Sequence, residues 1–478
     1  MMAVAISLVS IFGATVAFHY LAVIRVMKEA FEASLSGMAT VVDQKLADRE
    51  KEAAVRSAGL TLVNATFQTA WRLLACFAVG AVPILVFDLA GIVSTGAMIE
   101  LMLRWDYIIG TTLFLFAAVW LVGRYRGRNR PRSAYSGVDQ LTHRIAFAGP
   151  AVQLTAADLE DRLFAKSIRE TSTEPPIFIT SLPRAGTTIL LEALSALPSV
   201  ATHLYRDMPF VMAPMLWSRL SGMFRKKSQL TERAHGDGIY VGYDSPEAFE
   251  EIIWRAFWPE KFHDRTIDLW SRNDAKADAA AFFDRHFRKI VLLRSNGKGR
   301  YVSKNNNNMA RLDLLPDLFP GAEIIVPLRE PAEHAASLLR QHENFLRQHS
   351  LDPFVERYMR DIGHLEFGNL HVPFSFPGFD ASAHSPLEPS YWLEYWIAAY
   401  QMTLERADRL HCVTQERVCE RPKAVMDTLC ERIGLDASGF DLTRLFHPIA
   451  RRVGGGVFDA RRLAAATDIY RALRHHEI

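Results

Sequence analysis

The sequence predicts an α/β domain in which a parallel sheet is flanked by helices, preceded by an all-α membrane region of about three spans. Two observations lead to this prediction. Apolar runs long enough to cross a bilayer are confined to the first quarter of the chain. From residue 177 onward, short apolar strands alternate with helical segments, as they do in parallel sheets. We therefore divide the chain into a membrane region (1–126), a linker with short helices (127–174) and a C-terminal domain (175–478).

The composition of the chain excludes several classes of protein. Of the 478 residues, 49% are hydrophobic, which is enough apolar material for a large core. The 55 Lys and Arg residues nearly balance the 53 Asp and Glu residues, so the net charge of +2 gives no reason to expect nucleic acid as a partner. The 4 Cys residues form no CxxC pair and no His/Cys zinc pattern, which argues against a disulfide scaffold and favours a reducing compartment.

Three apolar segments are the predicted membrane spans. Residues 2–24 carry no charge, residues 73–95 are interrupted only by Asp88, and residues 106–123 are uncharged after their first residue. A helix of about 20 residues crosses the hydrocarbon core of a bilayer, so each segment is close to the required length. A cleaved signal peptide is the alternative for the first segment. For the second segment the alternative is a re-entrant hairpin, because Pro83 and Asp88 lie inside it.

The distribution of Lys and Arg predicts the orientation of these spans. Basic residues are concentrated between the first two spans and in an arginine cluster at 124–132, whereas the link between the second and third spans holds Arg104 alone. The positive-inside rule therefore places the N-terminus outside and the C-terminal domain in the cytosol. We expect the arginine cluster to face anionic lipids rather than nucleic acid. Residues 26–70 are predicted to form cytosolic helices that join the spans, and no heptad persists long enough to favour a coiled coil.

The C-terminal domain is predicted from alternating short elements. We expect strands at residues 177–182, 290–294, 301–304 and 323–329, and helices at 156–168, 187–197, 309–319 and from about 333. Each predicted strand is a short apolar run, and each predicted helix carries apolar residues at helical spacing. Buried parallel strands with intervening helices follow from this order.

The segment that follows the first predicted strand has the chemistry of a phosphate-binding loop. It reads Ser-Leu-Pro-Arg-Ala-Gly-Thr-Thr over residues 181–188 and leads directly into a helix. A strand, a tight loop and a helix start present backbone N–H groups and the positive end of a helix dipole to an anion. The fold is therefore P-loop-like, but Ser181 replaces the first glycine and Thr187 the lysine of GxxxxGK[ST], which argues against a nucleotide triphosphatase or P-loop kinase. The plain alternative is a turn that only caps a helix.

The loop resembles the 5′-phosphosulfate loop of sulfotransferases that use 3′-phosphoadenosine-5′-phosphosulfate (PAPS), in which PRSGTT is typical. A second stretch agrees with the KNPxNxxR and RxPxxxxxS motifs of these enzymes, at the positions Lys304, Asn305, Asn308, Arg311, Arg329, Pro331 and Ser337. Asn306 stands where proline is usual. The resemblance covers residues 175–435 and is closest to bacterial and tyrosylprotein-type sulfotransferases. With the three predicted spans, we expect a multi-pass protein of a bacterial inner membrane. In the YEDL region, Gln415 and Arg417 depart from the pattern and leave the adenine contact unassigned.

The resemblance implies a role for each matching residue. The 5′-phosphate would be held by the loop residues Arg184, Ala185, Gly186, Thr187 and Thr188. Lys304 would neutralise the charge that develops on the leaving oxygen, a task suited to a mobile cation. Arg329 and Ser337 would bind the 3′-phosphate. No metal is expected, because the histidines lack the spacing of a metal site. Residues 451–456, which read Arg-Arg-Val-Gly-Gly-Gly, form either a further phosphate loop or a flexible turn.

The acceptor hydroxyl needs a general base, and several residues are candidates. Asp207 lies 23 residues after Arg184, near the position of a catalytic Glu in tyrosylprotein-type relatives, and Glu250 competes with it. Further candidates are His203, His235, Asp237, Asp244, Glu247 and Glu251. Trp254, Phe257 and Trp258 either line an acceptor cleft or belong to the core.

These features together predict a membrane-anchored, PAPS-dependent sulfotransferase that modifies a hydroxyl acceptor. A carbohydrate, glycolipid or lipid-linked glycan at the membrane would suit an enzyme tethered among membrane lipids. The alternatives are a non-catalytic nucleotide-binding membrane protein with a degenerate domain of this type and, with less support, a P-loop kinase.

Overall fold

The chain forms two compact units. The computed structural model describes residues 2–27, 29–30, 48–107, 109–112, 137–221, 231–232, 240–241, 244–247, 249–447 and 457–478. The first unit is Met1–Gly137 with Ala148–Val152, and the second is Val138–Phe147 with Gln153–Ile478.

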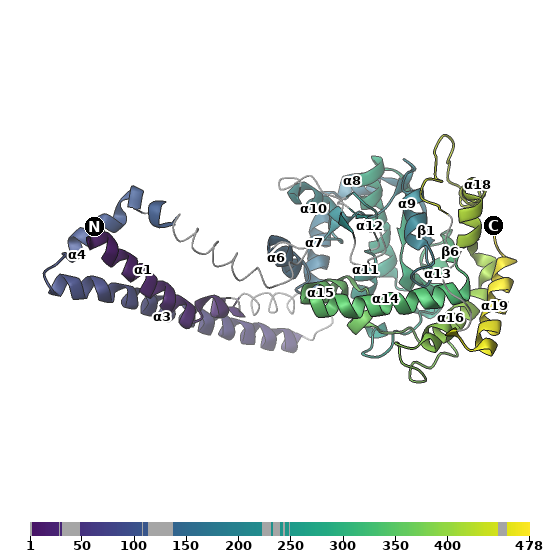
Figure 1. Cartoon of the computed structure of the whole chain (residues 1–478). Helices are drawn as coiled ribbons and strands as arrows, with labels where there is room; N and C mark the ends of the chain where they lie inside the picture. The colour runs from purple at the N-terminus through teal and green to yellow at the C-terminus, as the bar shows by residue number, and fades with distance from the viewer. Residues whose placement is uncertain are drawn as a thin grey trace. The chain divides into compact units, whose positions relative to one another are not determined.

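The first unit is helical. Its helices are α1 (Met2–Tyr20), α3 (Asp48–Leu89) and α4 (Thr95–Leu103). Helix α1 lies alongside α3 (Figure 1), and the two helices run in opposite directions, since Gly13 meets Val79 while the Arg72 guanidinium donates to Leu21 O at 2.8 Å. A Cβ added at Gly80 would lie 3.2 Å from Ala14 Cβ, so small residues allow this close approach.

The described residues support fewer spans than the three predicted from the sequence. One helical segment, Arg56–Leu89, is long and apolar enough to cross a membrane, and only 6% of its most apolar stretch is buried. Helix α1 contributes a shorter apolar stretch, Met2–Phe18. Most of the third predicted span and the arginine cluster at 124–132 lie outside the described residues.

Helix α3 contains most of the second predicted span. The helix continues without a break from Asp48 to Leu89, so no turn separates the end of the segment predicted to be cytosolic (26–70) from the start of the span predicted at 73–95. It also continues through Pro83, and no re-entrant turn occurs there. The missing hydrogen bond of a proline is tolerated in a long apolar helix when neighbouring groups compensate.

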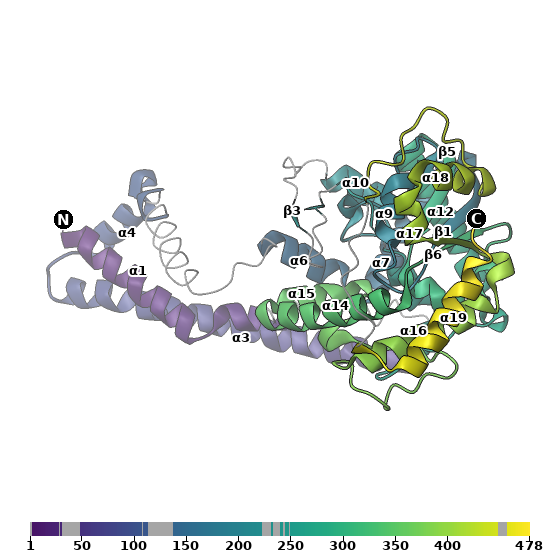
Figure 2. The ribbon, with the colours of Figure 1, turned by 45° about the vertical axis from the view of Figure 1, so that its right-hand side comes forward.

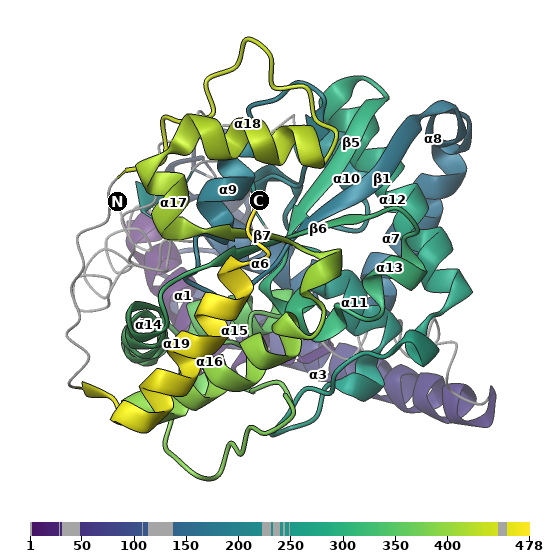
Figure 3. The same cartoon turned by 90° about the vertical axis from the view of Figure 1, so that its right-hand side faces the viewer.

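The second unit is built on a five-stranded sheet whose strand pairs are all parallel. The strand order is β2 (Val200–Ala201), β5 (Lys298–Lys304), β1 (Ser172–Ile179), β6 (Glu323–Leu328) and β7 (His411–Thr414). Ile179 pairs with both Lys304 and Ile325, so β1 and β5 end at the same level. The carboxyl ends of the central strands therefore share one edge (Figure 3), where ligands bind in sheets of this type. A separate ribbon pairs β3 (Thr231–Glu232) with β4 (Tyr240–Val241).

Helices cover both faces of the sheet. On one face, the apolar core joins strand residues such as Ile177 and Val302 to α9 (Thr187–Leu194) and α18 (Pro422–Arg432). On the other face, Phe178 packs against Phe287 of α12 (Ala277–Ser295). The remaining helices are α6 (Gly137–Ala146), α7 (Pro150–Leu163), α8 (Ala165–Glu170), α10 (Pro214–Ser221), α11 (Glu251–Phe257), α13 (Leu315–Leu318), α14 (Pro331–Leu351), α15 (Pro353–Ile362), α16 (Pro389–Leu404), α17 (Gln415–Glu420) and α19 (Ala460–Arg474). Helices α14, α16 and α19 pack together (Figure 2).

The structure differs from the predicted elements at several places. For example, the helix predicted at 309–319 is a 3₁₀ turn, Asn306–Arg311, followed by the short helix α13. Residues 290–294 belong to α12 and are not a strand. A short apolar run fits a buried strand or a buried helix equally well, and here the helix begins at Ala277 and places Ile290 and Val291 in the core. Strand β7 was not predicted, because its four residues, His-Cys-Val-Thr, carry little apolar pattern.

Candidate functional site

The loop after β1, residues 180–186, is fixed to the neighbouring strand and helix. Thr180 N–H donates to Ile325 O at 2.9 Å, and the Ser181 hydroxyl donates to Pro327 O at 2.7 Å. The Tyr400 hydroxyl of α16 lies 2.6 Å from Ser181 Oγ. These contacts hold the start of the loop at the carboxyl edge of the sheet.

A histidine supports the middle of the same loop. His334 Nε2 lies 2.8 Å from Pro183 O, and the Trp396 indole N–H donates to His334 Nδ1 at 3.1 Å. Because Nδ1 accepts, the ring proton resides on Nε2 and donates to the loop carbonyl. Burial lowers the pKa of His334 to about 3, so the ring is neutral at physiological pH. Sequence reasoning missed both His334 and Tyr400, since neither belongs to a motif.

The end of the loop has a left-handed backbone. Arg184 has φ 75° and Gly186 has φ 97°. Left-handed conformation costs little only for glycine, so the backbone at Arg184 is strained. Strained residues of this kind cluster at ligand-binding and catalytic sites. Gly186 is the N-cap of α9, and a Cβ added there would lie 3.5 Å from Gln415 Nε2. The Gln415 side chain therefore lies over the loop, which the sequence did not predict.

Lys304 stands at the carboxyl end of β5, beside a carboxylate. Lys304 Nζ lies 3.5 Å from Glu247 Oε1, and the side chains are 7% and 4% exposed. The Tyr205 hydroxyl donates to Glu247 Oε2 at 2.6 Å. From the sequence, Glu247 was one of several carboxylates that could serve as the general base. The structure pairs Glu247 with Lys304.

The residues after Lys304 tie β5 to the loop and to α11. The Thr187 hydroxyl donates to Asn306 Oδ1 at 3.1 Å, and Asn305 Nδ2 donates to Glu251 Oε2 at 2.9 Å. Arg311 holds the same carboxylate through both guanidinium nitrogens, at 2.9 and 2.7 Å. Glu251 is therefore fully engaged, and the nearby charge of Arg311 keeps its pKa low despite burial.

The proposed contacts of the 3′-phosphate lie together. Arg184 Nε donates to Ser337 Oγ at 3.4 Å, and Arg329 Nη1 donates to Arg184 O at 3.1 Å. Arg329 also lies 3.6 Å from Glu333. Burial lowers the pKa of Arg329, and the positive charges of Arg184 and Arg340 act in the same direction. Two clustered guanidinium groups at a helix start suit a phosphate.

A small cavity, open to solvent, lies against the loop. We call it the loop cavity; it is lined by Pro183, Arg184, Thr187, Thr188, Lys304, Asn306, Phe345, His349, Met359, His364, Glu366 and Phe367. The structure thus brings Arg184, Thr187, Thr188 and Lys304 to one cavity, whereas the lining does not include Ala185, Gly186, Arg329 or Ser337. His349 was not predicted: its Nδ1 accepts from Asn369 N–H at 3.2 Å, so its neutral ring carries the proton on Nε2.

The lining of this cavity does not include Asp207 or Glu250. It does not include Glu247 either, but Glu247 contacts Lys304, which lines the cavity. Asp207 is 1% exposed and engages His203 at 3.1 Å, Leu204 N–H at 2.9 Å and Arg294. These partners keep the pKa of Asp207 low although burial opposes them.

The remaining candidate residues differ in their surroundings. The Glu250 carboxyl lies against the Tyr301 and Ser303 hydroxyls, and burial raises its pKa. Trp254 and Trp258 are buried in the core, while Asp244 is exposed and pairs with Arg206. His235, Asp237 and residues 451–456 lie outside the described residues. Within the described part of the chain, no group of three or more His, Cys, Asp or Glu side chains is placed to hold a metal ion.

Comparison with known families bears on this site. The model of the sulfotransferase family matches residues 175–373, which include Arg184, Lys304, Arg329 and Ser337. This segment is a sulfotransferase-family domain. No curated protein matches the chain. The phosphate-binding loop, the end of β5 and the start of α14 all fall within the matched segment, whereas β7 and Gln415 follow it.

Three solved structures are similar to this chain. Sulfotransferase STF1 from Mycobacterium tuberculosis is 12% identical over 74% of this chain and 90% of its own, with a TM-score of 0.38. Sulfotransferase STF9 from Mycobacterium avium is 15% identical over 72% and 86%, with a TM-score of 0.40. A sulfotransferase from Alicyclobacillus acidocaldarius is 13% identical over 64% and 98%, with a TM-score of 0.33. At such scores the family assignment depends on the sequence match alone.

Proposed function

We propose that this chain is a membrane-anchored sulfotransferase that transfers a sulfuryl group from PAPS to the hydroxyl of an acceptor. The observation that carries the proposal is the convergence of Arg184, Thr187, Thr188 and Lys304 on one cavity. Arg329 and Ser337, both in contact with Arg184, extend this group of anion-binding side chains. The sulfotransferase-family match of the same segment supports sulfuryl chemistry over phosphoryl chemistry.

The proposed mechanism assigns one task to Lys304 and one to its ion-pair partner, Glu247. The acceptor oxygen forms a bond to sulfur while the bond between sulfur and the bridging phosphate oxygen breaks. Lys304 neutralises the charge that develops on the bridging oxygen. Glu247, 3.5 Å from Lys304, takes the proton of the acceptor hydroxyl. Tyr205 orients this carboxylate through its 2.6 Å hydrogen bond.

The helices of the first unit provide the proposed anchor. Helices α1 and α3 pair in opposite directions, so both can enter the bilayer as a hairpin. The basic residues Arg25, Arg49, Lys51, Arg56 and Arg72 lie toward the same end of this pair, which favours a cytosolic location for that end. A donor made in the cytosol and an acceptor held at the membrane, such as a glycolipid or lipid-linked glycan, fit this arrangement.

The alternative from another class is a nucleotide-binding membrane protein without catalysis. A degenerate domain would keep the phosphate contacts and lose the base. The buried Glu247 favours the enzyme, because its carboxylate lies beside Lys304, where a general base could act.

Donor binding is the first test of the proposal. Full-length protein in phospholipid nanodiscs is titrated by calorimetry with 3′-phosphoadenosine-5′-phosphate (PAP), AMP and ATP. We expect PAP to bind at least about ten-fold more tightly than AMP, because a charged hydrogen bond contributes about 1.5–3 kcal/mol. In Arg329→Ala this preference should disappear.

The matched control is Arg347→Ala, an exposed arginine on the same helix as Ser337. It should leave the affinities for PAP and AMP unchanged. Equal affinities for PAP, AMP and ATP in the wild-type protein would refute the proposed donor, and the loop would then serve another nucleotide.

A further inference from the structure

The ring of His349 carries a buried hydrogen-bond donor that has no acceptor. His349 lies in the last turn of α14 and is 3% exposed. Its Nε2 atom is shielded from solvent and meets no hydrogen-bond partner in the part of the chain that the structure describes. Buried polar groups in proteins nearly always have a partner. Because His349 lines the loop cavity, an unpaired N–H group at this position indicates a contact that a ligand completes.

The opposite edge of the His349 ring is held by the turn after α15. Asn369 N–H donates to His349 Nδ1 at 3.2 Å. A Cβ added at Gly368 would lie 2.7 Å from Nδ1 and 2.8 Å from Cε1 of the same ring, so the backbone packs directly against this edge. Gly368 has φ 68°, which also favours glycine. The edge that carries Nε2 is therefore the part of the ring left to line the loop cavity.

The His349 ring acts as a neutral donor. Because Nδ1 accepts from Asn369, the ring proton resides on Nε2. Burial lowers the pKa of His349, although the nearby charge of Glu356 opposes this effect. With Nδ1 engaged and Nε2 protonated, the ring has no free lone pair that could take a proton from an acceptor. His349 can thus bind an oxygen atom, whereas the proposed base is Glu247.

Most of the polar side chains that line the loop cavity are hydrogen-bond donors. Lys304 and Arg184 are cationic. The Thr187 hydroxyl donates to Asn306 Oδ1 at 3.1 Å, which leaves Asn306 Nδ2 as a further donor. Glu366 is the one acidic residue in the lining formed by the described part of the chain. A small cavity with such a lining suits a single oxyanion.

The position of His349 in α14 distinguishes it from the proposed contacts of the 3′-phosphate. Ser337 lies near the start of this helix, and His349 follows it after twelve residues. At 1.5 Å per residue, the two positions are about 18 Å apart along the helix axis. A 3′-phosphate bound at Ser337 is therefore out of reach of the His349 ring. The oxyanions that remain are the 5′-phosphate and the sulfuryl group, and Lys304 at the same cavity favours the sulfuryl group.

We propose that the loop cavity holds the sulfuryl group of the donor, and that His349 Nε2–H donates a hydrogen bond to one of its oxygens. This inference rests on the proposed function. In the reaction the acceptor oxygen bonds to sulfur, and the bond from sulfur to the bridging oxygen breaks with its electron pair left on the phosphate. The acceptor proton passes to Glu247. His349 keeps its proton and contacts an oxygen that carries negative charge throughout the transfer.

Removal of the N–H group tests the inference, because PAPS carries the sulfuryl group and PAP does not. Full-length protein in nanodiscs is titrated by calorimetry with PAP and, in the absence of acceptor, with PAPS. In His349→Leu the affinity for PAPS should fall about ten-fold or more, as expected when a hydrogen bond to a charged group is lost. The affinity for PAP should change less than about two-fold. A fall of equal size for both ligands would place His349 at the 5′-phosphate and overturn the inference, as would unchanged affinities for both.

A second variant separates the lost donor from lost packing. In His349→Gln the side-chain amide can place an N–H group near the position of Nε2. We expect His349→Gln to bind PAPS at least about three-fold more tightly than His349→Leu, while both variants bind PAP like the wild-type protein. Retained PAP binding shows that each variant is folded. Equal affinities of the two variants for PAPS would mean that the N–H group does not contact the sulfuryl group.

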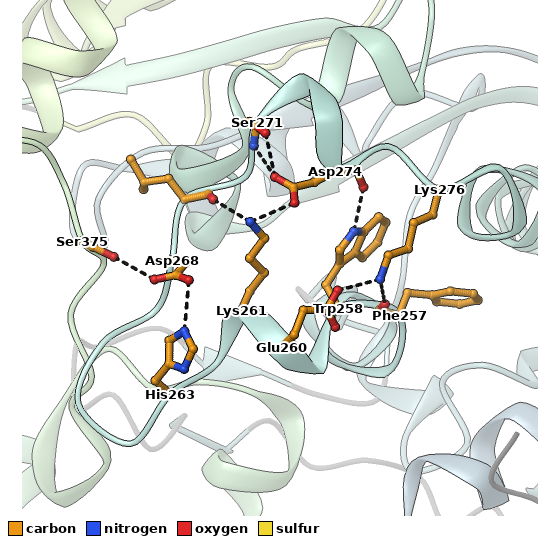
Figure 4. A network of polar contacts seen from close by, with 11 residues as sticks. Phe257, Trp258, Glu260, Lys261, His263, Asp268, Ser271, Asp274, Lys276 and Ser375 are labelled. Atoms are coloured by element: carbon orange, nitrogen blue, oxygen red, sulfur yellow. Dashed lines mark hydrogen bonds and ion pairs between the residues drawn. The ribbon is translucent and has the colours of Figure 1, made fainter. Parts of the chain in front are cut away.

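His263→Leu is the matched control. The His263 side chain is 50% exposed and does not line the loop cavity. Figure 4 shows its surroundings: His263 Nε2 lies 3.0 Å from Asp268, which also accepts from the Ser375 hydroxyl at 3.4 Å. Lys261 pairs with Asp274 at 2.9 Å in the same network, so the segment keeps other contacts when His263 is replaced. This variant should retain the wild-type affinities for PAP and PAPS.

The two ligands also distinguish the failure of this inference from the failure of the proposed function. If the wild-type protein binds PAP in preference to AMP but the His349 variants leave the ratio of PAPS to PAP affinity unchanged, His349 does not bind the sulfuryl group and the proposed donor site still stands. If the wild-type protein does not bind PAP, both proposals fail.

Discussion

Replacing Glu247 by glutamine tests the proposed general base. Glutamine keeps the shape of the side chain and an oxygen that accepts from the Tyr205 hydroxyl 2.6 Å away, but it cannot take a proton at neutral pH. General base catalysis contributes about 10²- to 10⁴-fold, which corresponds to about 3–5 kcal/mol of the barrier. We therefore expect kcat of Glu247→Gln to fall by that factor.

The effect on the donor should have the opposite sign. Lys304 Nζ and Glu247 Oε1 lie 3.5 Å apart. At an effective dielectric constant of about 20, this separation corresponds to about 5 kcal/mol of attraction. In Glu247→Gln the charge of Lys304 is no longer compensated and is fully available to the anionic donor. The affinity for PAP should then stay constant or increase while kcat falls.

The assay combines two readings on full-length protein in nanodiscs. PAP affinity is measured by calorimetry, and kcat is measured with the hydroxyl acceptor that reacts fastest. Asp244→Asn is the matched control: this exposed carboxylate lies in the same segment and pairs with Arg206 instead of Lys304. It should retain wild-type kcat. If Glu247→Gln keeps more than about half of the wild-type kcat, Glu247 is not the base.

Three further substitutions test the fold around the site. Asp207→Asn removes the buried charged partner of Arg294 and should lower the free energy of unfolding by about 3–5 kcal/mol. Thermal unfolding should therefore move to lower temperature, while PAP affinity is retained. An unchanged melting temperature with lost kcat would instead make Asp207 the base. Burial raises the pKa of Glu160 from its usual 4.5 to about 7. The folded state therefore binds this proton more tightly, and the free energy of unfolding should fall by about 3 kcal/mol between pH 4.5 and 7. Glu160→Gln should flatten this dependence in denaturant titrations at several pH values, and an unchanged slope would contradict the assignment. Gly186→Ala forces a left-handed alanine into the loop at about 1–2 kcal/mol, so calorimetry should show PAP affinity reduced about ten-fold; Gly378→Ala, at φ 81° in open space, is its control and should bind PAP normally.

The clustering of the residues proposed to bind the donor could be predicted from the sequence because these residues follow strands. Arg184 belongs to the loop after β1, Lys304 is the last residue of β5, and Arg329 directly follows β6. The carboxyl ends of parallel strands share one edge, so residues at these positions meet even when they are distant in the chain. Ser337 joins them because it lies two turns into the helix that begins after Arg329.

The base could not be chosen in the same way. Residues 244–251 hold several carboxylates, and their tasks depend on partners that the local sequence does not contain. Glu251 is bound by Arg311, Glu250 lies against Tyr301, and only Glu247 meets Lys304. Tertiary packing therefore decides which carboxylate remains at the site, and no spacing in the sequence encodes that choice.

Arg311 connects this packing to the proposed chemistry. Its guanidinium lies 4.3 Å from the ring of Trp254 and 4.2 Å from that of Trp270, and it is fully buried. In this position it holds Glu251, which in turn binds Asn305, the residue next to Lys304. The segment that begins with Glu247 is thus attached to the end of β5 at two neighbouring points. The two attachment points on β5, Lys304 and Asn305, are adjacent, so we expect loss of the Glu251–Asn305 contact to affect the position of Glu247 as well. Arg311 would then act on the proposed base through Glu251, although it does not line the loop cavity.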